Sequence, residues 1–196
     1  FVEIYNNSSK LINLKNWKLA NASADGQPDN RKIITSQDLI MEPYTYLVLT
    51  TDIQSLVAYF PKAANHFILE MSLPSYTIRS GTVILLDPEE RWQERFDYDE
   101  DYHHGFIRDA KGISLERHAV TAPANDPKNW HSAAASENFA TPGYKNSQVY
   151  EGNEAGIGLT LSPEVFVPAA AGEQPFTTIS YQMDQPNYQA TLRIFT

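Results

Sequence analysis

The chain contains no cysteine, which excludes disulfide bonds and zinc sites built on thiolates. It also has no apolar run of about eighteen residues, the length that a membrane-spanning helix needs. No signal peptide is recognisable either. However, the sequence begins and ends inside alternating strand patterns, 1–5 and 190–195. We therefore expect it to be a piece of a longer protein, without membrane insertion.

Basic residues are scarce. The sequence has 15 Lys and Arg against 24 Asp and Glu, which gives a formal net charge of −9. Proteins that bind nucleic acid use a basic face to displace counterions, and no basic cluster occurs in this chain. The charge pattern therefore argues against a nucleic-acid partner and against an anionic membrane surface.

Recognisable catalytic motifs are also missing. The sequence has no G-x-S-x-G elbow, no H-E-x-x-H pair and no phosphate-binding glycine loop. Five histidines and many serines remain as candidate bases and nucleophiles, and we expect His118 and His131 to serve as polar partners of loop carbonyls instead. The sequence thus predicts a protein that is not an enzyme and that needs no cofactor. The histidines are His66, His103, His104, His118 and His131.

The composition that is present favours strands joined by turns. Aromatic residues make up 12% of the chain, and 12 prolines and 11 tyrosines occur. The strongest strand is 81–87 (GTVILLD), and with the turn at 88–90 and the alternating segment 91–98 it predicts a hairpin. Residues 44–50 are apolar on both faces, as in a central strand between two layers. Residues 67–71 read as a further strand.

Two other segments depart from this pattern. Asp52 is a helix N-cap candidate, and apolar residues follow at 53, 56, 57 and 60 before Pro61. This spacing predicts one short helix near 52–60. The polar run 21–31 contains Gly26 and Pro28, and it is expected to be a surface loop.

Residues 112–147 open as a strand and then lose all periodicity, yet they keep three large side chains, Trp130, Phe139 and Tyr144. A disordered segment would be poor in such residues. We interpret this stretch as an ordered wrap that is anchored to the β-scaffold, with Trp130 closing one end or edge. The other tryptophans, Trp17 and Trp92, lie in alternating strands and are expected in the core.

The acidic segment 97–104 is the strongest candidate metal site. Asp97, Asp99 and Asp101 have the D-x-D-x-D spacing of a calcium loop. However, Tyr102 stands where an EF-hand loop has glycine, and Arg108 stands where it has glutamate. An exposed acidic turn is therefore the favoured interpretation, with a calcium or other divalent site as the alternative.

From residue 148 the sequence changes character. A glycine-containing linker is followed by alternating series that begin at 157, 176 and 189. Three or so strands in 49 residues bury too little surface to stand alone. The sequence therefore predicts two domains, 1–147 and 148–196. The second is the N-terminal part of a β-sandwich whose open edges would pair with another copy or another chain.

Several segments resemble known families. FVEIYNNSSKLINLKNWKLAN, GTVILLD, GISLER, NDPKNWHSA and FATPGYKNS together resemble the bacterial lamin-tail domain, an immunoglobulin-like β-sandwich, over about residues 1–147. LSPEVFVP and FTTISYQMDQPNYQATLRIF are similar to the start of the immunoglobulin-like C-terminal domain of flagellar hook-capping and gliding-type secreted proteins. The expected fold is thus all-β: an immunoglobulin-like sandwich with one short helix, plus a partial second immunoglobulin-like domain.

These resemblances imply a secreted or cell-envelope bacterial protein. In it, the two modules would act as non-catalytic spacers or docking surfaces for a protein or cell-surface partner. Two alternatives stay open. The chain could be the accessory binding domain of a secreted hydrolase or nuclease, or an adhesion module that calcium stabilises.

Overall fold

The structure is a computed structural model that describes residues 1–105, 107–149, 159–163 and 176–181. By their internal contacts the residues form two compact units, Phe1–Tyr150 and Glu151–Thr196. The sequence placed this division at 147/148, three residues earlier. No helix among the described residues is long and apolar enough to cross a membrane.

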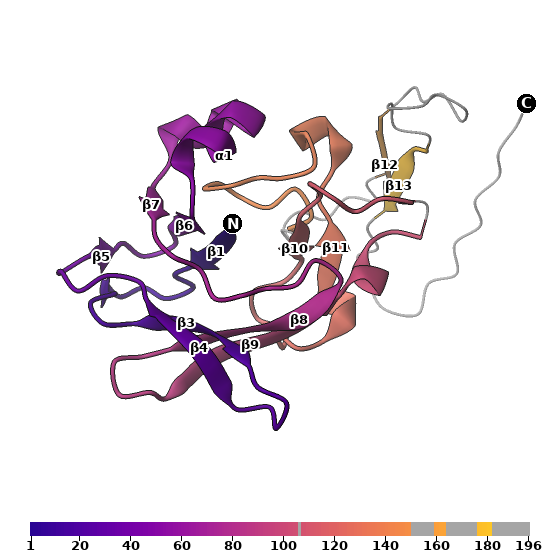
Figure 1. The fold of residues 1–196 in the computed structure, drawn as a ribbon. Helices are drawn as coiled ribbons and strands as arrows, with labels where there is room; N and C mark the ends of the chain where they lie inside the picture. Colours follow the sequence, from indigo (N-terminus) through magenta and orange to yellow (C-terminus); the bar gives the residue numbers. More distant parts are fainter. Residues whose placement is uncertain (106, 150–158, 164–175, 182–196) are drawn as a thin grey trace, which may run out of the picture. The chain divides into compact units, whose positions relative to one another are not determined.

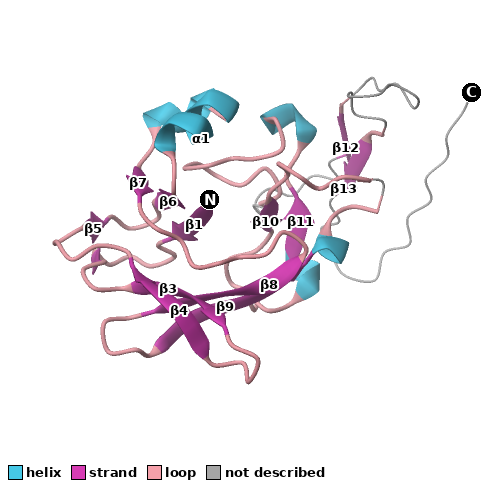
Figure 2. Cartoon of the chain, in the orientation of Figure 1, coloured by secondary structure: helices cyan, strands magenta, loops and turns pink. Residues whose placement is uncertain are grey.

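Two sheets form the body of the first unit (Figures 1 and 2). The three-stranded sheet has the order β1 (Val2–Tyr5), β6 (Tyr46–Thr50), β7 (Ile68–Glu70), and the four-stranded sheet has the order β4 (Pro28–Ile33), β3 (Lys18–Ala22), β8 (Ser80–Leu86), β9 (Trp92–Asp99). Two short ladders accompany them: β2 (Ile12–Asn13) with β5 (Ile40–Met41), and β10 (Leu115–Arg117) with β11 (Trp130–Ser132). The described residues are thus mostly β-structure, as an all-β protein requires.

The main core lies between the two large sheets. Leu47 and Leu49 of β6 are fully buried and join Leu19 of β3 in one cluster. Val83 and Leu85 of β8 pack against the same cluster. Burying each such side chain contributes roughly 1.5–3 kcal/mol, so this contact holds the sheets face to face.

The central-strand prediction for 44–50 is confirmed by β6, which lies between β1 and β7. Its partner β7 runs parallel to it, and parallel neighbours need a crossover. The predicted helix supplies it as α1 (Ile53–Tyr59). The Asp52 carboxylate accepts the Ser55 N–H at 2.9 Å and caps the helix, and a 3-10 turn then begins at Pro61.

The predicted hairpin 81–98 is also confirmed, as β8 and β9. In contrast, the surface-loop prediction for 21–31 is wrong at both ends, because β3 extends to Ala22 and Pro28–Ile33 forms β4. This strand lies at the sheet edge and pairs with β3 through its backbone. An edge strand of this kind needs no continuous apolar face, so its polar sequence hid it.

The core prediction for the two tryptophans holds in part. Trp17 is half-buried and packs against the main core. Trp92 is 44% exposed, so the core prediction is wrong for it. The pairing of β8 with β9 shifts between Leu85 and Leu86, which places Trp92 opposite Leu86 but Phe96 opposite Val83. This β-bulge turns Trp92 to the sheet face opposite Phe96.

In the second unit the described strands are β12 (Leu159–Ser162) and β13 (Thr178–Tyr181). They pair antiparallel, with Leu159 opposite Tyr181 and Ser162 opposite Thr178. The series expected from residue 189 lies outside the described residues. The partial-sandwich and edge-pairing expectations for this unit therefore stay predictions.

Candidate functional site: an acidic cleft closed by the wrap

A cavity of about 650 Å³ lies in the first unit, bordered by β1, β8, β9 and β10. Its lining is largely apolar and includes the rings of Phe1, Tyr5, Phe60, Phe96 and Trp130. This volume is in the range of small-molecule and peptide-side-chain sites. The cavity is therefore the candidate binding site of the first unit.

Carboxylates gather along this cavity. Among the described lining residues, five carry a carboxylate and Arg117 carries a permanent positive charge. Arg117 already forms an ion pair with Glu94, with 2.9 Å between Nη1 and Oε2. Glu100 lies 3.9 Å from Arg79, whereas Asp99 and Glu116 form no ion pair with a described residue, so the lining carries a net negative charge. The five carboxylates are those of Glu3, Glu94, Asp99, Glu100 and Glu116.

Glu116 of β10 is buried, with an exposed fraction of 3%. Its carboxylate accepts the hydroxyl of Thr141 at 2.5 Å and that of Ser147 at 2.6 Å. It also accepts the backbone N–H of Gln148 at 3.2 Å. A buried charge requires such partners. Here Thr141 and Ser147 belong to the wrap, and Gln148 follows it directly. Glu116 therefore fixes the end of the wrap to β10.

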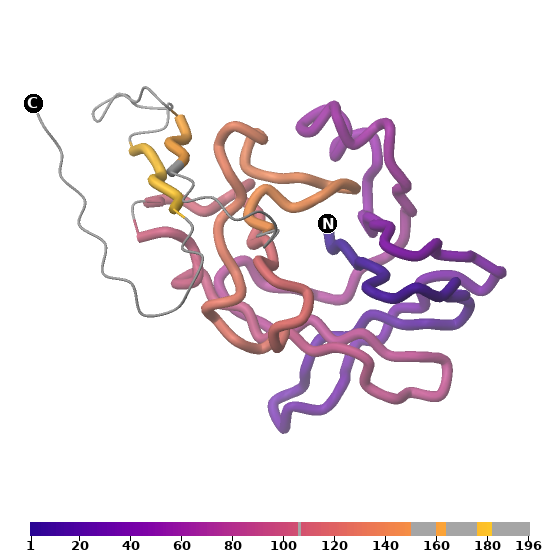
Figure 3. The backbone as a smooth tube through the Cα atoms, turned by 180° about the vertical axis from the view of Figure 1, so that it is seen from behind, coloured from indigo at the N-terminus to yellow at the C-terminus, as the bar shows by residue number. Residues whose placement is uncertain are grey.

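Glu3 of β1 contacts the tip of the wrap. Its Oε2 accepts the backbone N–H of Gly143 at 2.6 Å, and the tip lies beside the N-terminus in Figures 1 and 3. Burial and, to a smaller extent, the nearby Glu116 charge raise the pKa of Glu3, and the Gly143 bond lowers it. Together these effects place the pKa at about 8. At neutral pH the Glu3 carboxyl is therefore mostly protonated.

Gly143 cannot be exchanged at this tip. Its φ is 92°, a conformation that L-residues avoid, and a Cβ at this position would lie 2.4 Å from the Cβ of His66. The wrap thus approaches His66 and Glu3 so closely that it leaves no room for a side chain.

The three expected anchors of the wrap, Trp130, Phe139 and Tyr144, are all partly buried. Trp130 stacks on Phe96 with ring centroids 3.6 Å apart and donates its indole N–H to the Ala124 carbonyl at 2.6 Å. Tyr144 stacks on His66 at 5.2 Å, and its hydroxyl lies 3.0 Å from Glu137. Phe139 adopts a positive φ of 65° just after a 3-10 turn, Ala135–Glu137.

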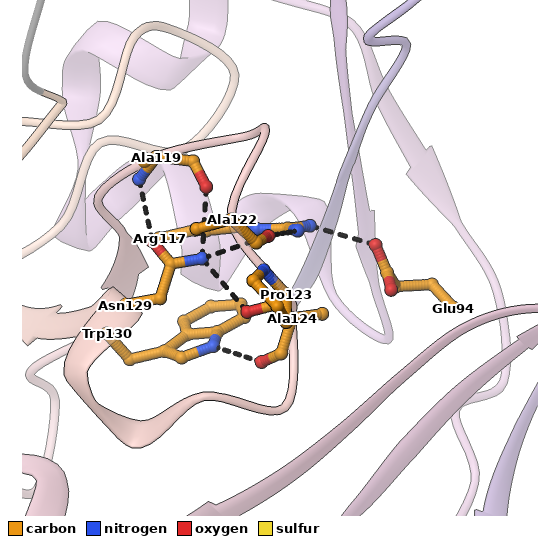
Figure 4. A network of polar contacts seen from close by, with 8 residues as sticks. All are labelled: Glu94, Arg117, Ala119, Ala122, Pro123, Ala124, Asn129 and Trp130. Atoms are coloured by element: carbon orange, nitrogen blue, oxygen red, sulfur yellow. Dashed lines mark hydrogen bonds and ion pairs between the residues drawn. The ribbon is translucent and has the colours of Figure 1, made fainter.

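Asn129 organises the loop that precedes β11 (Figure 4). Its Oδ1 accepts the Ala119 N–H at 2.8 Å. Its Nδ2 lies 3.0–3.3 Å from the carbonyls of Ala119, Ala122 and Pro123. The side chain is 3% exposed, so these contacts replace water for the whole amide. The loop therefore takes its shape from one side chain.

Replacing Asn129 with aspartate should lower the free energy of unfolding by roughly 2–4 kcal/mol, because a buried carboxylate would face carbonyl oxygens that have lost their donor. Asn16→Asp is the matched control, since the Asn16 side chain is exposed. Denaturant titration of both variants measures the difference. Equal losses in the two variants would contradict the role assigned to Asn129.

The candidate calcium ligands do not assemble. Asp97 lies on β9, and its carboxylate accepts bonds from Arg95 at 2.9 Å and Thr82 at 2.7 Å. Burial acts to raise the pKa of Asp97, but these bonds and that from Asn125 hold it below its usual value. Asp99 instead caps the next turn by accepting the Asp101 N–H. Among the described residues, no group of three or more His, Asp or Glu side chains is placed to hold a metal.

The histidines contact the wrap and the cleft rim. His118 Nδ1 lies 2.5 Å from the Gln148 carbonyl, as expected for a polar partner of a loop. The His131 ring packs edge-on against the His118 ring, with centroids 5.5 Å apart. His103 Nδ1 lies 3.1 Å from the Ser132 hydroxyl, which also accepts the His104 N–H. His103 and His118 therefore each have a polar partner among the described residues.

Sequence reasoning did not single out Glu3, Glu116 or Asn129. One signal bore on Glu3 alone: the β6 segment is apolar on both faces, and Glu3 lies opposite Val48 on one of them, so a second layer has to cover that face. No family model matches the chain, and neither a curated protein nor a solved structure matches it. The geometry of the cleft is therefore the basis for a functional proposal.

Proposed function

We propose that residues 1–147 form a non-catalytic interaction module of a larger secreted or cell-surface bacterial protein. The observation that carries this proposal is the 650 Å³ cleft, which is lined by aromatic rings and bordered by carboxylates. Aromatic side chains on a fixed scaffold are typical of binding sites. The hydrogen bond from the Gly143 N–H to Glu3, which we call the clasp, holds the wrap to β1 beside the cleft.

The proposed fold is an immunoglobulin-like β-sandwich of the lamin-tail kind. Its support is the resemblance of five segments, together with two sheets that face each other across one core. The parallel pair of β6 and β7 is an additional feature that this proposal has to accommodate. For residues 148–196 we keep the proposal of a partial second immunoglobulin-like domain that associates with another copy or partner.

Site-specific photo-crosslinking tests the interaction module. A photoreactive residue at Ile78, which lines the cleft and is 82% exposed, should form adducts with a macromolecule in cells that make the full-length protein. The matched control is Ile33 of β4, which is 52% exposed and is not a lining residue. Excess unlabelled protein should suppress the Ile78 adduct. Adducts at neither position, or equally at both, would contradict a partner site in the cleft.

A further inference from the structure

The hydrogen bonding of β6 determines which groups of β1 are engaged. Val48 of β6 donates its N–H to Phe67 at 3.0 Å, on the β7 side. Successive residues of a strand direct their backbone groups to opposite sides. Leu47 and Leu49 therefore direct their N–H and C=O toward β1.

On β1, the residues opposite Leu47 and Leu49 are Ile4 and Val2. These two complete the ladder, so Glu3 and Tyr5 direct their N–H and C=O away from β6. Outside the ladder with β6, no backbone–backbone hydrogen bond joins Glu3 or Tyr5 to another described residue. Such an open edge is a template for another strand.

The cavity runs along this edge. Every residue of Phe1–Tyr5 lines it, whatever the direction of its side chain, and so does every residue of Gly112–Arg117 on the opposite side. Side chains of a strand alternate between faces, so a cavity lined by consecutive residues lies beside the strand edges. An occupant there meets backbone donors and acceptors as well as side chains.

Charge and surface select the chemistry of the occupant. Beside the Glu94–Arg117 pair, the cleft presents the carboxylates of Asp99, Glu100 and Glu116, since Glu3 is mostly protonated at neutral pH. Phe96 and Trp130 supply an aromatic wall. A strand that alternates apolar side chains with a lysine or arginine matches both features. Backbone bonds would give affinity, and the alternate side chains would give specificity.

We infer that the cleft binds an extended peptide segment that carries a basic residue and adds to β1 as a further strand. This inference rests on the proposed function, because it names the partner class of the same cleft. Its two elements are the free backbone groups of Glu3 and Tyr5 and the acidic lining.

Selection from a random octapeptide library on the immobilised chain tests the partner class. We expect the enriched peptides to share one Lys or Arg at a fixed position, flanked by alternating apolar residues. Exchange of that basic residue for glutamate should weaken binding at least tenfold in fluorescence titration. Enrichment of acidic or unpatterned peptides, or of none, would overturn the inference.

Two variants at one position test the backbone contact. Tyr5→Pro and Tyr5→Ala lose the same side chain, but only the proline variant loses the outward N–H. Proline is tolerated in an edge strand where the N–H does not join the ladder. The selected peptide should bind Tyr5→Pro at least tenfold more weakly than Tyr5→Ala. Equal affinities in two variants with equal melting temperatures would overturn the inference.

A ligand-side test does not depend on the fold of any variant. N-methylation of alternate amides should abolish binding for the peptide amides that face β1 and spare the others. Loss of binding with both methylation patterns, or with neither, counts against strand addition. Analytical ultracentrifugation tests whether a second copy of the chain occupies the β1 edge instead. A concentration-dependent dimer that Tyr5→Pro abolishes would count against the peptide inference. The Ile78 crosslink reports separately on the proposed function, which survives if adducts form while these tests fail.

Discussion

Glu3→Gln should make the protein more stable at neutral pH, on the order of 2–3 kcal/mol at pH 7. The folded pKa of Glu3 is raised from 4.5 to about 8 by burial and by the Glu116 charge, in spite of the Gly143 bond. Between these values the unfolded chain releases a proton that the folded chain keeps, and this favours unfolding. Glutamine removes the proton exchange, and its amide oxygen can still accept the Gly143 N–H.

The sign of this effect is visible in the pH dependence. A raised folded pKa means that stability is greatest below pH 4.5 and is lost as pH rises to about 8. Wild type should lose about 1–1.5 kcal/mol between pH 7 and pH 9, and Glu3→Gln should lose none through this residue. Burial lowers the pKa of His103 and is the main cause that lowers that of His131, so both titrate below this window.

Urea titrations at pH 7, 8 and 9 measure this difference. Glu42→Gln is the matched control, because the Glu42 side chain is exposed. The control should follow wild type at every pH. Parallel curves for wild type and Glu3→Gln would show that Glu3 does not hold its proton at neutral pH.

Trp130→Ala should destabilise the first unit by roughly 3–5 kcal/mol, the usual cost of deleting a large aromatic side chain. The substitution removes the stack on Phe96 and the hydrogen bond to Ala124. Trp92→Ala is the matched control, on β9, the strand that carries Phe96. Trp92 is 44% exposed, and the Arg95 guanidinium lies over its ring, 5.6 Å from the ring centroid.

Chemical denaturation monitored by circular dichroism distinguishes the two tryptophans, with a loss below about 1 kcal/mol expected for Trp92→Ala. Trp130→Phe adds a finer test. This variant keeps a ring against Phe96 but loses the indole N–H donor. Its loss of unfolding free energy should therefore exceed the loss expected from the smaller apolar ring alone by about 1 kcal/mol. A Trp130→Ala loss as small as that of Trp92→Ala would refute the anchoring role.

Local signals predicted the elements that depend on local physics. The α1 helix follows from the cap at Asp52 and the stop at Pro61, and the β8–β9 hairpin follows from alternation around a turn. The same alternation placed Trp92 on the wrong sheet face. A bulge of one residue in β9 moves the side chains on its N-terminal side, including Trp92, to the opposite face. No residue pattern around 91–95 announces that bulge.

The cleft depends on contacts that sequence spacing does not encode. Glu3 alternates with Val2 and Ile4, so it reads as a solvent-facing residue, yet the wrap covers it from 140 positions away. Likewise, Asn129 looks like an ordinary turn residue in a proline-containing segment. Its role arises because four backbone groups converge on one buried amide.

The clasp between Glu3 and Gly143 also bears on how the chain folds during synthesis. It joins the first strand to residues near the end of the first unit, a separation of 140 positions. Contacts of such range slow folding, because loop closure costs entropy before any contact is gained. At about 5–20 residues per second, the ribosome adds the wrap many seconds after β1. Until then the Glu3 side chain lies uncovered, which is when a chaperone or a second nascent chain would find this face of β1.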